Sequence, residues 1–322
     1  MKRSTIVCLI VAVSLMALGA MVFVVGMTMK GFSFSNTFTT ARLETLSYDI
    51  EEKFDDIKII SNTADINFYA SDNDSAKVVC YEDAKLKYDV SVTDGTLTIT
   101  LSDERRWYDH ITFFSPDTNV DIYLPAGEYG ALSINTNTSD IDIPEDFTFT
   151  SLDIDLTTGD VDCSASVKDT FKIKATTGNL KLSKISAASV DLKTTTGRIA
   201  VTDLTCEGDV SVKVSTGKTI FNNVACKNLI STGGTGDVKL KGVIATEKFD
   251  IKRSTGDVEF DRCDAAEITI VTDTGEVEGS LLTEKIFFVK TDTGDVDVPR
   301  TTTGGTCDIT TDTGDIEIYV IG

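Results

Sequence analysis

The chain of 322 residues carries 51 acidic and 30 basic side chains, a formal net charge of -21, and 41% of its residues are hydrophobic. This composition supplies enough apolar residues for a core beneath an acidic surface. It argues against a nucleic-acid partner, because phosphate backbones attract segregated Lys and Arg clusters, and the longest such cluster is Arg105-Arg106.

The first predicted element is an apolar stretch from Thr5 to Met29, 25 residues without a charge or a proline. Its length suffices to cross a bilayer as a helix. Lys2 and Arg3 precede it and favour a cytoplasmic N-terminus. We therefore expect a single-pass anchor in the cell membrane, with the C-terminal domain outside the cytoplasm. A cleaved signal peptide is the alternative, because small residues occur at 17–20, although the apolar stretch continues beyond them.

The next part of the chain predicts short, irregular β-structure. Residues 88–92 and 97–100 alternate around Asp94-Gly95, which is typical of a β-hairpin with a two-residue turn. The segment 124–130 predicts a turn that leads back into a strand. Two sequences, at 62–68 and 138–143, are weak copies of the repeat that follows, so the repeat architecture is expected to begin before its most regular part.

An aromatic segment interrupts this region at residues 105–114 and contains the single tryptophan of the chain. Aromatic side chains on a loop can anchor a protein partner, a polysaccharide or a membrane surface. They can equally plug the open end of the first coil as a cap. The candidate interaction residues are Trp107, Tyr108, Phe113 and Phe114.

Nine Thr-Gly dipeptides then recur at intervals of 19 or 20 residues. Their glycines are Gly159, Gly178, Gly197, Gly217, Gly236, Gly256, Gly275, Gly294 and Gly314. A period of this length is the signature of stacked supersecondary units. Each glycine permits a positive φ at a turn. The threonine before it suits a stack in which its hydroxyl bonds the neighbouring coil.

Two strands flank each of these glycines. Apolar residues stand two and four positions after the glycine and five and seven positions before it, with polar residues between them. This alternation indicates strands that bury one face. Thr219, Ser231 and Gly279 are exceptions to the pattern. Lysines that are expected to face outward stand four positions before the glycine: Lys174, Lys193, Lys213, Lys252 and Lys290.

Such a unit cannot bury its apolar face alone, so consecutive repeats must stack as coils. The predicted fold is all-β, a single β-solenoid of 19–20-residue coils with one N-terminal transmembrane helix. We divide the chain into three parts. Residues 1–30 form the cytoplasmic end and the helix, 31–135 a linker and an irregular cap with the first coils, and 136–322 the regular solenoid.

The repeats, the sequence FDDIKI at 54–59 and the sequence YLPAGEY at 123–129 together resemble the DUF4097 family over about residues 45–322. These bacterial envelope proteins are described as adhesin candidates. The resemblance implies a β-solenoid in the cell envelope, and some members are linked to envelope stress responses. It offers no catalytic residues for transfer to this chain.

Several motifs resemble catalytic or metal-binding sites, but the repeat pattern explains them better. Asp-Thr-Gly occurs at 273–275, 292–294 and 312–314, yet aspartic proteases need two such loops that face each other. The acids before and after these turns should stack in ladders of like charge. Calcium could neutralise such ladders, whereas a solvated acidic edge requires no ion. We expect no cofactor, and calcium is the alternative.

The positions of the seven cysteines in the repeat argue against a disulfide framework. Cys163, Cys263 and Cys307 stand in columns that hold Val, Leu, Ile or Phe in other coils, so a small buried hydrophobe is the expected role. Cys206 and Cys226, one coil apart, are the one plausible bridge. No zinc-binding spacing occurs.

We expect a non-enzymatic protein that presents the sides of a rod to a cell-surface protein or an envelope polymer, as an adhesin or a scaffold. A regulatory component of an envelope stress response is one alternative, and a polysaccharide-active β-helix is another. Oligomerisation through the ends of the solenoid is also expected where a strand edge is left unpaired.

Overall fold

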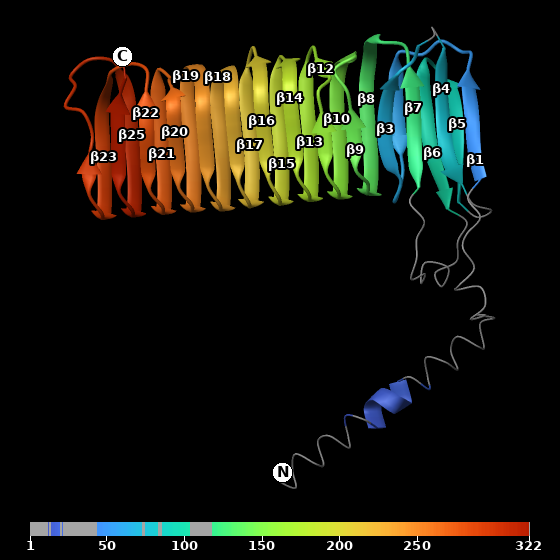
Figure 1. The fold of residues 1–322 in the computed structure, drawn as a ribbon, viewed down its shortest axis with the longest axis horizontal. Coiled ribbons are helices and arrows are strands. Elements are labelled where there is room, and N and C mark those ends of the chain that lie inside the picture. The colour runs from blue at the N-terminus through green and yellow to red at the C-terminus, as the bar shows by residue number, and fades with distance from the viewer. Residues whose placement is uncertain are drawn as a thin grey trace.

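The computed structural model describes residues 12, 14–19, 21, 44–72, 75–82, 86–103 and 118–321. Helical backbone is present at 12, 14–19 and 21. Within these ranges no helix has the length and apolar character that crossing a membrane requires. Most of the predicted anchor at 5–29 lies outside them. The rest of the described chain forms one all-β rod of about ten turns, with coils of about 20 residues side by side along its long axis (Figure 1).

The described residues contain 26 β-strands. The strands of the N-terminal part are β1 (Glu44–Ile50), β2 (Asp56–Ile60), β3 (Asp65–Ala70), β4 (Ala76–Glu82), β5 (Leu86–Thr93), β6 (Thr96–Asp103) and β7 (Asn119–Leu124). The first strands of the regular coils are β8 (Gly127–Thr138), β9 (Ile141–Ile143), β10 (Phe147–Thr158), β11 (Val161–Cys163), β12 (Ser166–Val167), β13 (Thr170–Thr177), β14 (Leu180–Ala187), β15 (Ser189–Thr196), β16 (Ile199–Cys206) and β17 (Asp209–Thr216).

The coils continue through longer and then shorter strands to the C-terminus. These are β18 (Thr219–Thr235), β19 (Val238–Thr255), β20 (Val258–Cys263), β21 (Glu267–Thr274), β22 (Val277–Leu281), β23 (Lys285–Thr293), β24 (Val296–Asp297), β25 (Gly305–Thr313) and β26 (Ile316–Val320).

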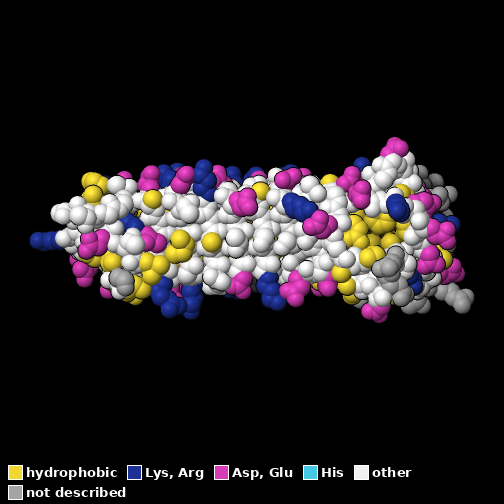
Figure 2. All heavy atoms as spheres, turned by 90° about the horizontal axis from the view of Figure 1, so that it is seen from above, with side chains coloured by type: hydrophobic (Ala, Val, Ile, Leu, Met, Phe, Trp, Pro, Cys, Tyr) yellow, Lys and Arg dark blue, Asp and Glu magenta, His cyan; other side chains and the backbone are white. Residues whose placement is uncertain are grey.

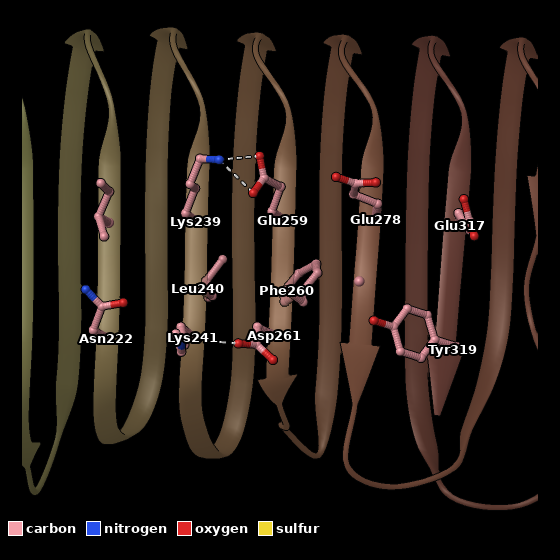
Figure 3. Close-up of a pocket in the computed structure, with 12 residues that line it drawn as sticks. Asn222, Lys239, Leu240, Lys241, Glu259, Phe260, Asp261, Glu278, Glu317 and Tyr319 are labelled. Carbon is pink, nitrogen blue, oxygen red and sulfur yellow. Dashed lines mark hydrogen bonds and ion pairs between the residues drawn. The ribbon is translucent and has the colours of Figure 1, made fainter. Parts of the chain in front are cut away.

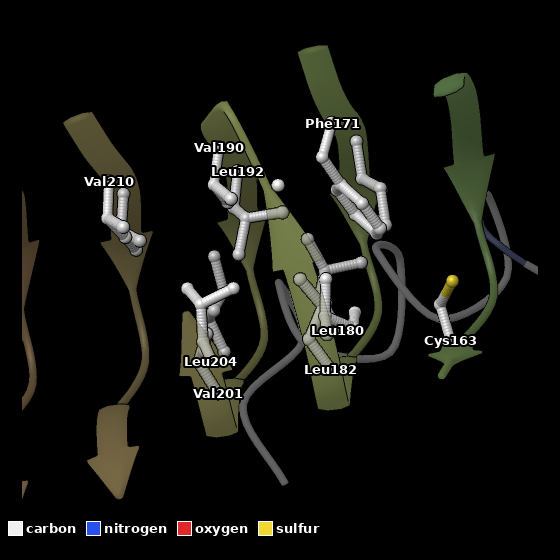
Figure 4. Packing of buried hydrophobic residues seen from close by; sticks show 14 of the residues in the cluster. Cys163, Phe171, Leu180, Leu182, Val190, Leu192, Val201, Leu204 and Val210 are labelled. Carbon is white, nitrogen blue, oxygen red and sulfur yellow. The ribbon is translucent and has the colours of Figure 1, made fainter. Parts of the chain in front are cut away.

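Each regular coil places one strand before its Thr-Gly turn and one after it. Strands from neighbouring coils pair in parallel and in register, so that Phe171 lies beside Val190 and Leu180 beside Ile199. The predicted apolar columns are buried in the interior (Figure 4). The prediction of a β-solenoid with coils of about 20 residues is therefore confirmed.

The turn glycines are required by close approach between coils. Their φ angles lie between 126° and 157°, a region that residues with a side chain rarely adopt. A Cβ atom added to Gly197 would lie 1.9 Å from the carbonyl oxygen of Gly178. The amide of Gly178 in turn donates to the carbonyl oxygen of Thr196.

Threonine hydroxyls do bond neighbouring coils, but from a different position than the sequence indicated. The threonines directly before the turn glycines are exposed, and their carbonyl oxygens accept the inter-coil hydrogen bonds. The hydroxyls that donate to a turn-glycine carbonyl of an adjacent coil stand three positions before the glycine. They belong to Thr194, Thr272, Thr291 and Thr311.

The last two coils do not follow chain order along the rod. β25 pairs with β21 on one side and with β23 on the other, and β26 likewise lies between β22 and β24. The C-terminal coil is therefore inserted inside the stack, and the coil before it forms the end of the rod (Figure 1). The expectation that consecutive repeats always stack is wrong here. The edge at the end of the rod belongs to β23, not to β26.

A second bend occurs six residues after the Thr-Gly glycine in five consecutive coils. Five residues in equivalent positions of consecutive coils adopt left-handed φ angles of 52° to 59°: Lys184, Asp203, Asn223, Gly242 and Arg262. Asp, Asn and Gly tolerate this conformation, whereas Lys and Arg do so at a cost. The left-handed bend is therefore a corner of the coil that is less obvious in the sequence than the Thr-Gly turn, and a third bend precedes the next strand, as at Ala188 and Gly208.

One buried arginine explains two of the exceptions to the apolar columns. Arg253 is 4% exposed, and its guanidinium donates hydrogen bonds to the hydroxyls of Thr219 and Ser231 and to the carbonyl oxygen of Lys252. Gly233 leaves space for it, because a Cβ there would lie 3.0 Å from an Arg253 nitrogen. Burial lowers the pKa of Arg253 to about 10. Thr219, Ser231 and Arg253 therefore form one hydrogen-bonded polar cluster inside the rod.

The N-terminal part closes the other end of the stack. β2 and β3 form a coil that lies against β8 and β9, so the weak copy at 62–68 stacks on the copy at 138–143. β4 then runs antiparallel to both β1 and β7. The predicted hairpin is present as β5 and β6, which turn at Asp94 and Gly95 with positive φ at both.

Candidate interaction surfaces

The predicted interaction residues Trp107, Tyr108, Phe113 and Phe114 lie outside the described residues. The strands that flank their segment, β6 and β7, both belong to the N-terminal part. Their role as an anchor for a partner or as a cap therefore stays a prediction.

The structure brings a different set of side chains together near the C-terminal end. A groove of about 450 Å³ runs across β18, β19, β20, β22 and β26 (Figure 3). Leu240, Phe260 and Gly279 contribute apolar lining and backbone. The polar and aromatic side chains that line it come from columns facing outward: Asn222, Lys239, Lys241, Glu259, Asp261, Glu278, Glu317 and Tyr319.

The groove lies where the repeat is locally interrupted. Gly279 occupies the column that holds Phe260 in one neighbouring coil and Ile318 in the other. Its φ is 139°, and a Cβ atom there would lie 2.0 Å from the carbonyl oxygen of Phe260, so a larger residue cannot occupy this backbone. The register also shifts between Phe260 and Cys263. The sequence marked Gly279 as an exception, but only the structure relates it to a groove.

The groove has a half along β19 and β20, where lysines and acids pair, and a half along β22 and β26, which is acidic. Lys239 donates to both carboxylate oxygens of Glu259, at 2.5 and 2.7 Å, and this hydrogen bond raises the pKa of the Lys239 ammonium. Lys241 lies 3.7 Å from Asp261. The column of Glu259 continues through Glu278 and Glu317, and among the described residues no basic side chain forms an ion pair with these two.

An exposed aromatic side chain borders the acidic half. Tyr319 is 53% exposed and stands two residues after Glu317 on the same strand, so both side chains face outward. This half can therefore contact a ligand by charge and by ring stacking together. Figure 2 shows that charged side chains line the two long sides of the rod in that view, with uncharged side chains and backbone between them.

The acids beside the Thr-Gly turns have a structural role. A carboxylate oxygen of Asp160 accepts the backbone N–H of Asn179 in the next coil, at 2.7 Å. Asp257 accepts from Glu276 and Asp315 from Asp295 in the same way, at 2.9 and 2.8 Å. Hydrogen bonds from backbone amides offset the repulsion within such a ladder.

Calcium at these ladders stays an alternative from the sequence. In the part of the chain that the structure describes, no group of three or more His, Cys, Asp or Glu side chains is placed to hold a metal ion. The three Asp-Thr-Gly aspartates are exposed and lie in one column, in the order Asp273, Asp312, Asp292. They do not face each other as the aspartates of a protease do.

The six cysteines of the described residues are buried free thiols. Cys206 and Cys226 occupy neighbouring coils without a bridge. Burial raises the pKa of the Cys163, Cys226 and Cys307 thiols to about 12, so they are protonated at neutral pH and weakly nucleophilic. The expected role of Cys163, Cys263 and Cys307 as small apolar core residues is confirmed by their burial.

The fold and these surfaces define a class, the β-solenoid with short two-strand coils and charged columns on its outside. The chain belongs to the Toastrack DUF4097 family, whose profile matches residues 54–210 and 205–321. The family expected from the sequence is thereby confirmed. No curated protein matches the chain.

Several solved structures are similar to this chain at low sequence identity. An adhesin candidate from Bacteroides fragilis is 13% identical and aligns with 86% of this chain and 97% of its own, with a TM-score of 0.41. One from Parabacteroides merdae is 12% identical over 75% and 96% of the two chains, with a TM-score of 0.44. One from Parabacteroides distasonis is 14% identical over 84% and 98%, with a TM-score of 0.42.

Proposed function

We propose that this protein is a non-enzymatic, membrane-anchored rod that binds a cell-surface protein or an envelope polymer outside the cytoplasm, as an adhesin or scaffold. The observation that carries this proposal is the groove across β18–β20, β22 and β26, where an acidic column and an exposed tyrosine border an apolar floor. Such a surface offers contacts to an extended partner.

The arrangement of charge in the groove favours binding over polysaccharide cleavage. Glycoside hydrolysis requires two carboxyl groups that flank the scissile bond from opposite sides. Here Glu259, Glu278 and Glu317 follow one column of parallel strands, and Glu259 is already paired with Lys239. These three acids form one wall of the groove, and Asp261, on the other side of Phe260, has the Lys241 ammonium 3.7 Å away (Figure 3).

The location rests on the sequence. The uncharged stretch from Thr5 to Met29 is long enough to span a bilayer, and the basic residues before it orient the rod outward. Labelling intact cells with a membrane-impermeant amine reagent tests this, because the exposed lysine columns should react without lysis. Labelling that requires lysis would contradict the location.

Capture from the native envelope tests the binding role. The bait is the full chain, compared with a groove variant that combines Glu278→Gln, Glu317→Gln and Tyr319→Ser. A matched control, Asp153→Asn with Asp155→Asn, neutralises two exposed acids on another face. We expect wild type and control to retain the same partner and the groove variant to lose it.

A third bait, which lacks residues 105–114, separates the groove from the aromatic segment. Loss of the partner with this bait and not with the groove variant would move the binding site to Trp107 and its neighbours. If the captured partner is a membrane sensor and the binding changes expression of envelope-stress genes, the regulatory alternative replaces adhesion.

A further inference from the structure

The end of the rod at β23 and β24 leaves the apolar interior open. In the neighbouring coil, Cys307 and Ile309 are 1% and 0% exposed. Their counterparts Phe287 and Val289 on β23 are only partly buried, and Val296 on β24 is 45% exposed. The insertion of the C-terminal coil therefore moves the open end to a different coil without closing it.

Apolar side chains also gather on the outside of this end. Phe288 is 58% exposed in a column that holds Thr269 and Asp308 in adjacent coils. Tyr319 in β26 and Ile321 directly after it are also exposed, at 53% and 44%. Hydrophobic side chains are visible toward this end of the rod, at the left of Figure 2. Phe288 therefore adds exposed apolar surface beside the partly buried Phe287 and Val289, which favours an interaction site at this end.

The strand at this end has a free edge. In the described residues β23 pairs with β25 as its one strand partner. At the start of β23 the hydroxyl of Thr301 donates to the carbonyl oxygen of Lys285, and the rest of the second edge has no strand beside it. Edge strands usually carry charge that blocks further pairing. β23 contains two lysines and one aspartate in a chain with a net charge of -21, and Lys290 is already paired with Asp292 at 2.8 Å. Two acidic rods can approach here without strong repulsion.

The opposite end cannot continue this stack. It is built from antiparallel pairs, β1 with β4 and β5 with β6, and its edge strands carry acids such as Asp49 and Asp89. A partner that docks on the β23–β24 end must continue both its strand pairing and its apolar core. Such a partner must therefore present a coil of the same cross-section. Within the described chain, that coil is the same β23–β24 end of another copy.

We propose that two copies of this protein associate end to end through β23, with the strands antiparallel about a twofold axis. The arrangement buries Phe287, Phe288 and Val289 of both copies and pairs the free backbone groups. A twofold contact of one surface with itself is closed, so it yields a dimer and not a fibre.

Light scattering of the full chain in detergent micelles, coupled to size exclusion, tests the proposal. Because the end face is one coil in cross-section, we expect a dissociation constant on the order of 10 µM. Phe288→Lys places a charge on the edge and should raise that constant at least about tenfold. Thr269→Lys adds the same charge in the same outward column, two coils away from the end of the rod. This control should leave the dissociation constant unchanged.

Circular dichroism shows whether both variants keep the fold, which is expected because neither residue belongs to the buried core. The proposal is overturned if wild type is monomeric up to roughly 100 µM. It is also overturned if both variants dimerise as wild type does, which would place association away from the β23 edge. Mass that keeps growing with concentration would replace the closed dimer by an open polymer.

Discussion

The ammonium nitrogen of Lys285 lies 2.6 Å from a carboxylate oxygen of Asp264, and the two side chains are 3% and 15% exposed. Lys285 begins β23, and Asp264 lies between β20 and β21, beside the place where β25 enters the stack. Lys285 also donates to the hydroxyl of Thr283. The pair therefore fixes the point at which the chain leaves the regular order of coils.

Loss of one partner should destabilise this end of the rod. Asp264→Asn leaves a buried ammonium without its counter-charge, and we expect a loss of about 3 kcal/mol. Amide hydrogen exchange in β23 and β25, together with urea unfolding, measures it. Asp292→Asn on the same strand removes an exposed partner of Lys290 and should cost less than about 0.5 kcal/mol. Equal effects would show that the buried pair does not fix the coil order.

A side chain at a Thr-Gly turn should be strongly destabilising. Gly197→Ala would place its Cβ 1.9 Å from the Gly178 carbonyl oxygen at a φ of 149°. We expect a cost above about 3 kcal/mol, because two coils must separate. Gly95→Ala is the matched control, since its φ is 76° and nothing lies within 4 Å of the new atom, and should cost about 1 kcal/mol. Thermal unfolding of both variants compares the two costs.

The local features of the coil were predictable from the sequence because each follows from a repeated column. The alternation around Gly159 through Gly314 predicts the buried faces, and Asp94-Gly95 predicts the hairpin turn. The order of the last coils was not predictable. Cys307 and Ile309 on β25 fill the same columns as Phe287 and Val289 on β23, so either coil could contact β21 with similar burial.

The groove and the arginine cluster were partly visible as departures from the pattern. Thr219, Ser231 and Gly279 broke apolar columns, yet nothing in a single sequence connects Thr219 to Arg253, 34 positions away. That connection depends on the stacking of three coils. The bend with left-handed φ angles was less visible in the sequence. Its signal was the presence of Asp203, Asn223 and Gly242, residue types that tolerate this conformation, at one position of the repeat.

Replacing a poorly suited residue at that bend should stabilise the rod. Lys184 has a φ of 57°, and Asn tolerates this conformation better. We expect Lys184→Asn to gain about 0.5 kcal/mol, even though its exposed ion pair with Glu145 is lost. Lys181→Asn removes a similar exposed pair with Asp162 and should give no gain. Urea unfolding distinguishes them, and a gain in the control would refute the conformational explanation.

Asp237 should contribute stability that depends on pH. The hydrogen bond from Lys218 and the backbone amide of Asp257 lower the pKa of this carboxyl. A depressed folded pKa means that the stabilisation is present above the unfolded value of 3.8 and disappears as pH falls through the lower folded value. Asp237→Asn should therefore cost about 0.5 kcal/mol at pH 7 and nothing near pH 2.

The control for Asp237→Asn is a carboxylate that has no lysine beside it. Asp146 is exposed and forms no ion pair among the described residues, so Asp146→Asn should show little difference from wild type across the same range. Urea unfolding at successive pH values measures both variants. A cost of Asp237→Asn that persists at pH 2 would assign its effect to packing instead of charge.

Arg253 should lower the stability of the rod relative to an apolar core. Its guanidinium is buried, no carboxylate pairs with it in the described chain, and its Nε has no hydrogen-bond partner there. Arg253→Met combined with Thr219→Val and Ser231→Val restores the apolar columns, and we expect a gain of about 1 to 3 kcal/mol. Ser231→Val alone should cost about 1 kcal/mol, because it removes an acceptor from a buried charge.

The pH dependence identifies the charge as the cause. The folded pKa of about 10 lies below the ordinary value of 12.5, so the unfolded chain binds more protons between these values. Wild-type stability should therefore rise relative to the triple variant as pH increases beyond about 10. Unfolding by urea at pH 8 and pH 11 measures the difference. A triple variant that is less stable than wild type at pH 8 would mean that the arginine cluster holds the coils together.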